Sequence, residues 1–283
     1  MRAAVMGSPI AHSLSPHLHR AAYREMGLAG WSYEAFECDE ARLPELLGEL
    51  APVRGEEPGE DGVWAGLSLT MPLKRAVLPL LDTVSEAAVE VGGANTVVFR
   101  DGRRHGDNTD IHGIEQALAE AGVPAPRSAV VLGGGATAAS ALAALRNLGL
   151  YAATLLVRDP ARAGGTAEVA ERLGVALAVE TFDKLDALTG VDLVVSTLPG
   201  GAADGFADRL AGVPALFDVV YSPWPTRAAA AVAAAGGTVV GGFAMLLHQA
   251  VRQVELMTGR ADVPVEAMRA AGEAEIRRRA ALP

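Results

Sequence analysis

The sequence predicts an α/β protein whose chain builds two domains. Short apolar, β-branched runs alternate with stretches of Ala, Leu, Glu and Arg at helical spacing. This strand–helix series is regular from residue 110 to about residue 242 and less regular on either side. A chain of 283 residues, 50% of them hydrophobic, is long enough for two cores. We therefore expect a first domain interrupted by a second, with the C-terminal segment returning to the first.

The predicted strands are the short apolar runs. They cover residues 2–6, 32–38, 62–69, 96–100, 128–132, 154–157, 176–181, 193–197, 216–220 and 238–240. The segment 51–62 contains Pro, Gly and four acidic residues, and this composition predicts a solvated loop.

Helices are predicted in several of the gaps between the strands. A helix over 16–26 would have Ser15 as its N-cap and a proline at its first position. Asp110 is a candidate cap for a helix over 111–121, and Gly149 ends a helix over 136–148. Two further helices, over 243–258 and 263–279, follow without a strand between them.

Composition excludes several classes of protein. Lys and Arg number 24 against 34 Asp and Glu, and the formal charge of −10 argues against a nucleic-acid-coating protein or a polybasic membrane binder. The single cysteine, Cys38, excludes an internal disulfide and a Cys-rich zinc module. The N-terminus is typical of a first strand rather than a signal peptide, and no run of about 20 residues is apolar enough to span a bilayer. We expect a cytoplasmic protein with no nucleic-acid or membrane partner.

A glycine-rich turn predicts a dinucleotide site. The predicted strand 128–132 runs into GGGATA at 133–138 and then into an Ala-rich helix, which matches the pattern G-x-G-x-x-A. Gly133 permits the tight turn, Gly135 lets the backbone approach a pyrophosphate, and Ala138 lets the helix pack closely. The helix N-terminus supplies N–H groups and the positive end of a dipole. The alternative is a glycine-rich turn without a ligand.

The residues after the next strand bear on which dinucleotide binds. In a Rossmann unit this position lies beside the adenosine ribose, where an acid favours NAD and an arginine favours the 2′-phosphate of NADP. The sequence has Arg158, Asp159 and Arg162 there. Two guanidinium groups could clamp one phosphate, so we favour NADP. Asp159 leaves strict selection of NADP open, and a plain surface pair of Arg158 with Asp159 is the alternative.

Polar clusters lie outside the nucleotide-binding segment. Ser13 lies close to a predicted helix N-terminus, a suitable place for a carboxylate, and capping does not account for it. Thr70 and Lys74 are four residues apart, and Pro72 starts a helix between them, so both side chains can face one cleft. Asn95 and Asp110 stand at element boundaries.

In these residues the chain resembles shikimate dehydrogenase. The shared patterns run in the order of that family across nearly the whole sequence. They are G-x-P-x-x-H-S-x-S-P-x-x-H at 7–19, G-x-x-x-T-x-P-x-K at 66–74, N-T at 95–96, N-T-D at 108–110, D-x-x-Y-x-P-x-x-T at 218–226 and G-x-x-M-L-x-x-Q at 242–249.

The resemblance implies an interrupted α/β substrate domain over 1–109 and 243–283, a Rossmann domain over 110–242 that binds NADP, and a cleft between them. It implies reversible reduction of 3-dehydroshikimate to shikimate, in the chorismate pathway to aromatic amino acids. Lys74 and Asp110 would be the catalytic pair. The implied substrate-binding residues are Ser13, Ser15, Thr70, Asn95, Tyr221 and Gln249. The implied cofactor-binding residues are Gly133, Gly134, Gly135, Ala136, Thr137, Arg158, Arg162, Val219 and Gly242.

The implied chemistry is coherent, because hydride transfer to a ketone develops negative charge on oxygen and a lysine ammonium can stabilise that charge and donate the proton.

Other functions stay open. A quinate/shikimate or aminoshikimate dehydrogenase, with relaxed or NAD preference, needs only one different pocket side chain. A non-catalytic ligand-binding paralogue would have lost the acid, but Lys74 is present. A metalloenzyme built on His12, His17 and His19 lacks a recognised ligand spacing, so we expect no metal. Family members include both monomers and dimers.

Overall fold

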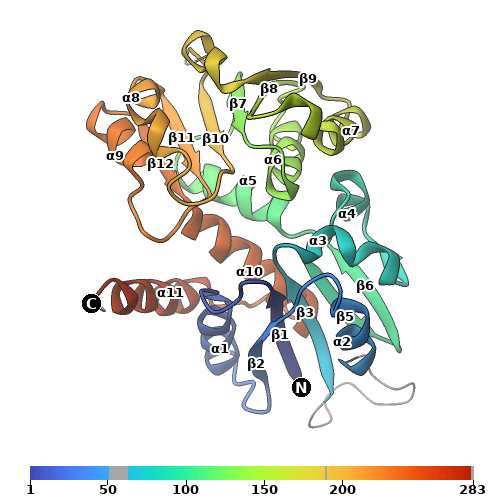
Figure 1. Cartoon of the computed structure of the whole chain (residues 1–283). Coiled ribbons are helices and arrows are strands. Elements are labelled where there is room, and N and C mark those ends of the chain that lie inside the picture. Colours follow the sequence, from blue (N-terminus) through green and yellow to red (C-terminus); the bar gives the residue numbers. More distant parts are fainter. Residues whose placement is uncertain (51–62, 189, 282–283) are drawn as a thin grey trace. The chain divides into compact units, whose positions relative to one another are not determined.

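The computed structural model describes residues 1–50, 63–188 and 190–281, and the chain divides into two compact units (Figure 1). Unit 1 comprises residues 1–109 and 249–283, and unit 2 comprises residues 110–248. Helix α10 (Gly242–Thr258) contains the second boundary, so the return to unit 1 falls a few residues after the predicted position at 243. The predicted loop 51–62 lies outside the described residues.

Unit 2 is built on a six-stranded parallel sheet. Its strands are β7 (Ala129–Leu132), β8 (Ala152–Val157), β9 (Ala176–Thr181), β10 (Leu193–Ser196), β11 (Ala215–Asp218) and β12 (Thr238–Gly241). The order β12-β11-β10-β7-β8-β9 reverses between β7 and β10, which is where doubly wound sheets bind their ligands. Strands β7, β10 and β11 are buried along their whole length, because helices cover both faces of such a sheet.

The helices of unit 2 precede the first of these parallel strands or connect one strand to the next. They are α5 (Asp110–Glu120), α6 (Ala136–Asn147), α7 (Gly164–Leu173), α8 (Ala207–Leu210) and α9 (Arg227–Ala234). Helix α6 packs against both α5 and α7. Its Ala-rich sequence keeps the side chains small, and Ala138 is fully buried near its N-terminus. Gly149, at φ +94°, follows the helix as predicted.

Unit 1 is built on a mixed six-stranded sheet in the order β2-β1-β3-β5-β6-β4. The strands are β1 (Arg2–Gly7), β2 (Ser32–Glu37), β3 (Trp64–Leu69), β4 (Thr83–Val84), β5 (Thr96–Arg100) and β6 (Arg103–Asp107). Strand β1 is parallel to β2 and β3, whereas β5 is antiparallel to β3 and β6. Parallel strands end at the same edge of a sheet, so the loops after β1 and β3 are neighbours.

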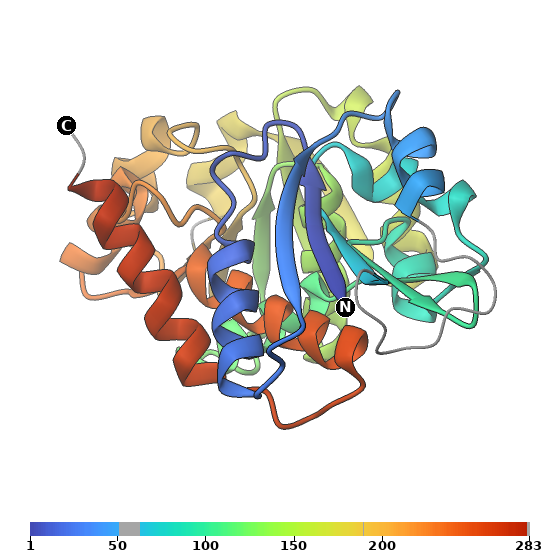
Figure 2. The ribbon, with the colours of Figure 1, turned by 90° about the horizontal axis from the view of Figure 1, so that it is seen from below.

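Helices cover both faces of the sheet in unit 1. They are α1 (Ser15–Glu25), α2 (Leu43–Leu50), α3 (Leu73–Ala76), α4 (Glu86–Val91) and α11 (Val265–Ala280), together with the C-terminal part of α10. A core cluster joins Met6 and Leu67 of the sheet to Leu47 of α2 and Leu73 of α3. Helix α1 lies beside α11 (Figure 2). Among the helices of the described ranges, none is long and apolar enough to cross a membrane.

The structure differs from the sequence-based expectation in two local respects. Strands β4 and β6 were not predicted, because both are short and β6 carries charged residues. The β5–β6 hairpin turns at Asp101 and Gly102, both at positive φ, and Asp-Gly is a signal that could have revealed it. The expected N-caps at Ser15 and Asp110 are wrong, because each of these residues is the first residue of its own helix. Helix α1 starts at Ser15 itself, where the side chain of Ser13 accepts the backbone N–H of Ser15 at 3.2 Å.

Candidate functional site

Two of the predicted substrate motifs lie side by side at the end of the sheet in unit 1. The backbone N–H of Thr70 donates to the carbonyl of Met6 at 2.9 Å, and the N–H of Ser8 donates to the carbonyl of Met71 at 2.9 Å. A Cβ at Gly7 would overlap the Cγ2 atom of Thr70 and touch the carbonyl of Met71. Gly7 is therefore required because the segments after β1 and β3 approach each other closely.

The buried side chain of Asn95 joins these loops to both places where the chain crosses between the units. Its Nδ2 donates to Oγ1 of Thr109 at 3.0 Å and to Oε1 of Gln249 at 3.3 Å. Its Oδ1 accepts the backbone N–H of Thr109 and the hydroxyl of Thr96, both at 2.8 Å. Thr109 ends the first segment of unit 1 and Gln249 begins the second. Asn95 thus fixes both crossing points within unit 1.

The hydrogen-bond network extends from the backbone carbonyl of Asn95 through Gln253 and Ser68 to Tyr33. Nε2 of Gln253 donates to the Asn95 carbonyl at 3.2 Å, and Ser68 donates to Oε1 of Gln253 at 2.7 Å. The hydroxyl of Tyr33 donates to Ser68 at 2.6 Å. Sequence reasoning assigned no role to Tyr33 or Gln253. The spacing of Gln253 four residues after Gln249 on α10 places both on one helix face, and this signal could have found it.

Ser13 and Ser15 lie where the loop after β1 enters α1. Ser13 is half-buried and Ser15 is buried, and Tyr33 also forms a hydrogen bond with the side chain of Ser15. Burial raises the pKa of Tyr33, so its hydroxyl stays protonated and acts as a donor. The ring of His19 stacks on Tyr33 at a centroid distance of 3.9 Å. The stacked rings of His19 and Tyr33 therefore support the segment that carries both serines.

The histidines of this segment do not form a metal centre in the described part of the chain. His19 is fully buried, and burial lowers its pKa to about 4, so it is neutral at pH 7. Its Nδ1 lies 3.0 Å from the carbonyl of Ser15, whereas Nε2 of His17 lies 3.6 Å from the carboxylate of Glu275. Across residues 1–50, 63–188 and 190–281, no three His, Cys, Asp or Glu side chains gather as ligands.

The expected catalytic pair is divided between the units. Lys74 is half-buried in the short helix α3 of unit 1, where its carbonyl accepts the N–H of Ala94 at 2.8 Å. Asp110 is the first residue of α5 in unit 2, and it is buried. Lys74 and Asp110 are each the last residue of a motif that the sequence analysis selected, and each lies in the first turn of a helix.

The glycine-rich turn of unit 2 combines a tight backbone turn with an open surface. Gly133 adopts φ +99°, and a Cβ there would lie 2.7 Å from Oγ1 of Thr197. That hydroxyl donates to the Leu132 carbonyl at 2.8 Å, and the hydroxyl of Thr166 donates to the Gly134 carbonyl at 2.8 Å. Gly135 is exposed with open space around it, so its backbone is accessible to a ligand. Ala136 and Thr137 start α6 directly afterwards.

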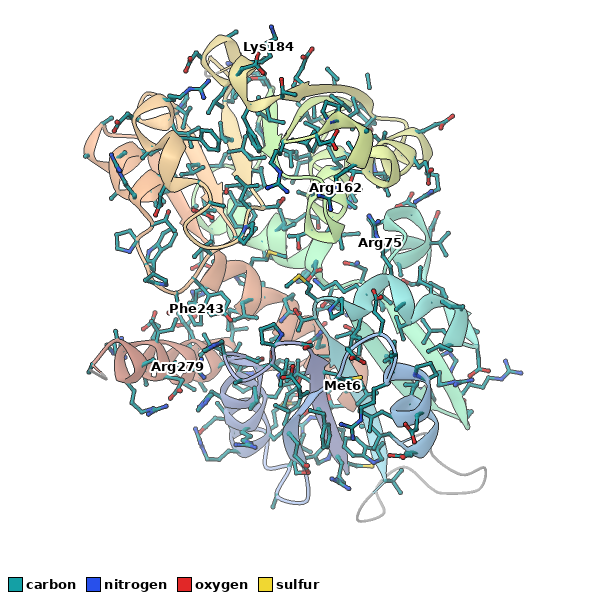
Figure 3. All side chains as sticks on the ribbon, in the orientation of Figure 1. Met6, Arg75, Arg162, Lys184, Phe243 and Arg279 are labelled. Atoms are coloured by element: carbon teal, nitrogen blue, oxygen red, sulfur yellow. The ribbon has the colours of Figure 1, made fainter. Side chains whose placement is uncertain are left out.

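A cavity of about 590 Å³ opens beside this turn, wholly within unit 2. The three glycines line it together with Arg158 and Arg162, and Figure 3 shows Arg162 on the segment that follows β8. Phe182 and Phe206, stacked at 4.9 Å, add an apolar wall. The structure therefore brings the predicted turn and both predicted arginines to one site, and these residues fit a dinucleotide that carries an extra phosphate.

Asp159 also lines the cavity, but its carboxylate already has a structural partner. Its Oδ1 accepts the backbone N–H of Ala161 at 3.0 Å and caps the 3₁₀ turn Pro160–Arg162. This turn carries Arg162, so Asp159 supports an arginine of the cavity wall.

The loop after β11 approaches the start of α10 at backbone distance. A Cβ at Gly242 would overlap the carbonyl oxygen of Val219, and the N–H of Gly242 donates to the Val220 carbonyl at 3.1 Å. Buried Asp218 holds this loop by accepting from Thr226 at 2.8 Å and from the N–H of Val220 at 3.2 Å. Burial raises the pKa of Asp218. Tyr221 is half-buried on the same loop.

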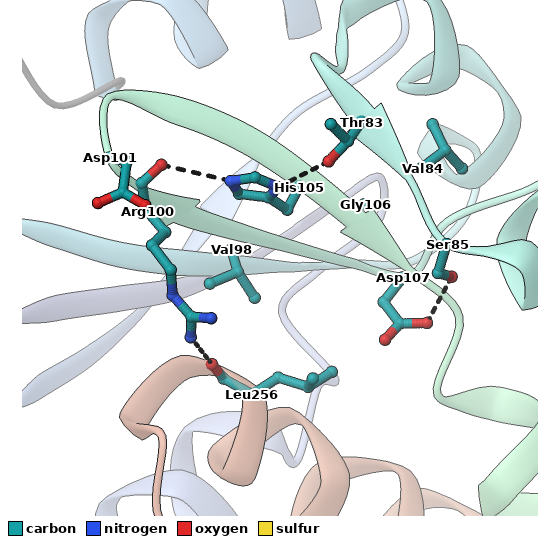
Figure 4. A pocket seen from close by; sticks show the side chains of 10 residues that line it. All are labelled: Thr83, Val84, Ser85, Val98, Arg100, Asp101, His105, Gly106, Asp107 and Leu256. Atoms are coloured by element: carbon teal, nitrogen blue, oxygen red, sulfur yellow. Dashed lines mark hydrogen bonds between the residues drawn. The ribbon is translucent and has the colours of Figure 1, made fainter.

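A second hollow, of about 330 Å³, lies in unit 1 beside β4, β6 and Leu256 of α10 (Figure 4). His105 spans it, with Nδ1 2.6 Å from Oγ1 of Thr83 and Nε2 3.3 Å from the carbonyl of Arg100. The predicted site residues, all of them in the described ranges, do not line this hollow.

Comparisons with known proteins agree with the sequence motifs. The family model described as "Shikimate dehydrogenase substrate binding domain" matches residues 5–97, and the one described as "Shikimate 5'-dehydrogenase C-terminal domain" matches residues 242–271. The shikimate dehydrogenase (NADP(+)) of Oleidesulfovibrio alaskensis is 35% identical over 270 residues, which cover 90% of this chain and 89% of that protein.

Solved structures show the same architecture. Mycobacterium tuberculosis shikimate dehydrogenase superposes with a TM-score of 0.86 at 43% identity, covering 96% of this chain and 99% of that one. Thermus thermophilus shikimate 5-dehydrogenase, solved with NADP(H) and shikimate, gives a TM-score of 0.82 at 34% identity and covers 97% and 99%. On its sequence, its motifs and its fold, the chain belongs to the shikimate dehydrogenase family.

Proposed function

We propose that the protein catalyses the reversible, NADP(H)-dependent reduction of 3-dehydroshikimate to shikimate. The observation that carries the proposal is the placement of the family motifs. In unit 1 the segments around Ser13 and Thr70 meet at one edge of the sheet, joined by the Asn95 network. In unit 2 the glycine-rich turn shares one cavity with Arg158 and Arg162. Each unit thus carries one half of a dehydrogenase site, and we propose that unit 1 binds the substrate and unit 2 the cofactor.

The cavity in unit 2 supports NADP as the cofactor. The accessible backbone of Gly135 and the N-terminus of α6 suit a pyrophosphate, and the guanidinium groups of Arg158 and Arg162 suit the 2′-phosphate. Ala136 and Thr137 complete the turn, and Val219 and Gly242 would flank the nicotinamide. NADPH, when bound, supplies the hydride.

In the proposed mechanism, Lys74 holds a proton at Nζ and delivers it to the carbonyl oxygen of the substrate as negative charge develops there. Asp110 orients the ammonium group and stabilises its charge. Ser13 and Ser15 donate to the substrate carboxylate. Thr70, Asn95, Tyr221 and Gln249 hold its hydroxyl groups, and the Asn95 network keeps Gln249 in place.

A two-by-two assay tests the proposed activity. The purified protein is given shikimate or quinate, each with NADP⁺ or NAD⁺, and nicotinamide absorbance reports turnover. We expect the highest kcat/KM for shikimate with NADP⁺. Turnover of quinate with NAD⁺, but not of shikimate with NADP⁺, would identify a quinate dehydrogenase instead. Binding of both ligands without any turnover would identify a non-catalytic paralogue.

The role of Lys74 is tested by Lys74→Ala. Loss of a positioned general acid typically lowers the rate about 10²–10⁴-fold, so we expect kcat to fall by that factor while binding of shikimate is largely kept. The sequence contains one other lysine, the exposed Lys184 (Figure 3), so Lys184→Ala is a matched control that should keep the wild-type kcat. A fully active Lys74→Ala enzyme would show that the acid has been assigned to the wrong residue.

The role of Asp159 is tested by comparing Asp159→Asn with Asp159→Ala. Asparagine keeps the oxygen that caps the turn, so we expect the KM for NADP⁺ to stay within about threefold of wild type. Alanine removes the cap that supports Arg162, and a cap worth about 1 kcal/mol corresponds to a KM raised about fivefold. If both variants instead bind NADP⁺ more tightly and lose activity with NAD⁺, the carboxylate of Asp159 selects between the two cofactors by repelling the 2′-phosphate of NADP⁺.

A further inference from the structure

The C-terminal helix α11 is hydrogen-bonded to the serine-rich segment that precedes α1. Nη1 of Arg279 donates to the carbonyl oxygen of His12 at 2.7 Å, and Nη2 donates to the carbonyl oxygen of Ser13 at 3.3 Å. One guanidinium group therefore holds two consecutive peptide carbonyls. Figure 3 shows Arg279 near the end of α11, and Figure 2 shows α11 running beside α1.

Glu275 in turn fixes the guanidinium of Arg279. Nε of Arg279 donates to Oε1 of Glu275 at 2.6 Å, and Arg278 donates through Nε and Nη2 at 2.7 and 2.8 Å. His17 on α1 faces the same carboxylate, with Nε2 3.6 Å from Oε1. Only 5% of the Glu275 side chain is exposed. The hydrogen bonds from Arg278 and Arg279 lower the pKa of Glu275 to about 2, so it is an anion at pH 7.

The contacts continue from Arg279 to a predicted substrate-binding hydroxyl. Ser13 belongs to the segment whose carbonyls Arg279 holds, and its Oγ accepts the backbone N–H of Ser15 at 3.2 Å. All three side-chain nitrogens of Arg279 donate to protein oxygens. Two of these three bonds go to the backbone of the segment that carries Ser13, so Arg279 contacts the serine-rich segment directly.

We propose that Glu275 and Arg279 are positioning residues that hold segment 12–15 in the conformation that binds the carboxylate of the substrate. This inference rests on the proposed function, in which Ser13 and Ser15 bind that group. Charge-assisted hydrogen bonds from a planar guanidinium are short and directional, so one residue near the C-terminus can set the direction of the peptide that carries Ser13. Binding both carbonyls requires the planar, two-pronged geometry of the guanidinium group as well as its positive charge.

The experiment compares Arg279→Ala and Arg279→Lys with Arg277→Ala. Arg277 is a matched control, because it lies on the same helix and forms an exposed pair with Glu273 at 3.4 Å. For Arg279→Ala we expect the KM for shikimate to rise about tenfold, which corresponds to about 1.4 kcal/mol, while kcat and the KM for NADP⁺ stay within about twofold. Lysine should rescue only part of the loss, since it cannot hold both carbonyls and Glu275 together.

A second readout separates this inference from the proposed activity. Hydrogen exchange of the amides in segment 8–15 should be faster in Arg279→Ala, and in Glu275→Gln, than in wild type and Arg277→Ala. Hydrogen exchange needs no turnover, so it still tests whether Arg279 and Glu275 hold segment 12–15 if the wild-type protein fails to oxidise shikimate. Unchanged exchange, or a KM for shikimate within about twofold of wild type, would overturn the proposal. Equal losses in shikimate KM, NADP⁺ KM and thermal stability would also overturn it, because they indicate general destabilisation.

Discussion

The buried carboxamide of Asn95 is the interaction on which the arrangement of unit 1 depends. A buried amide must have its donors and acceptor satisfied, because an unpaired group costs about 1–3 kcal/mol. Asn95 meets this requirement with Thr96, Thr109 and Gln249, which come from β5, from the segment after β6 and from α10. The chain enters and leaves unit 2 directly beside Thr109 and Gln249. One side chain therefore ties the sheet to both crossings of the chain.

Close backbone approach is the second constraint, and it accounts for three glycines of the motifs. Gly7 leaves room for the loop after β3, and Gly133, at φ +99°, lies close to the side chain of Thr197. Gly242 lies against the backbone carbonyl of Val219. At each of the three positions a side chain would collide with a neighbouring segment of the chain instead of pointing into solvent. The same glycines thus serve the packing of each unit and, under the proposed function, leave room for a ligand beside the backbone.

The sequence predicted those parts of the fold and site that local patterns encode. The glycine-rich turn, its strand and its helix were recognisable because spacing and context lie within one continuous segment, and the structure places Arg158 and Arg162 in the same cavity. The cap at Ser15 was predicted wrongly, because Ser13, two residues earlier, accepts the N–H of Ser15. The contact between Arg279 and Ser13 spans 266 residues, and no periodicity in the sequence reports such a pair. Tyr33 was missed for the same reason, whereas the spacing of Gln253 four residues after Gln249 on α10 is a local signal that could have found it.

Under the proposed function each unit binds its own ligand, NADP on unit 2 and the substrate on unit 1. Hydrogen exchange of the intact protein, measured with NADP⁺ alone and with shikimate alone, tests it most directly. NADP⁺ should slow exchange at 133–137 and 158–162, and shikimate should slow exchange at 12–15 and 66–74. Protection by NADP⁺ confined to residues 1–109, with none at the glycine-rich turn, would show that unit 2 does not bind the cofactor.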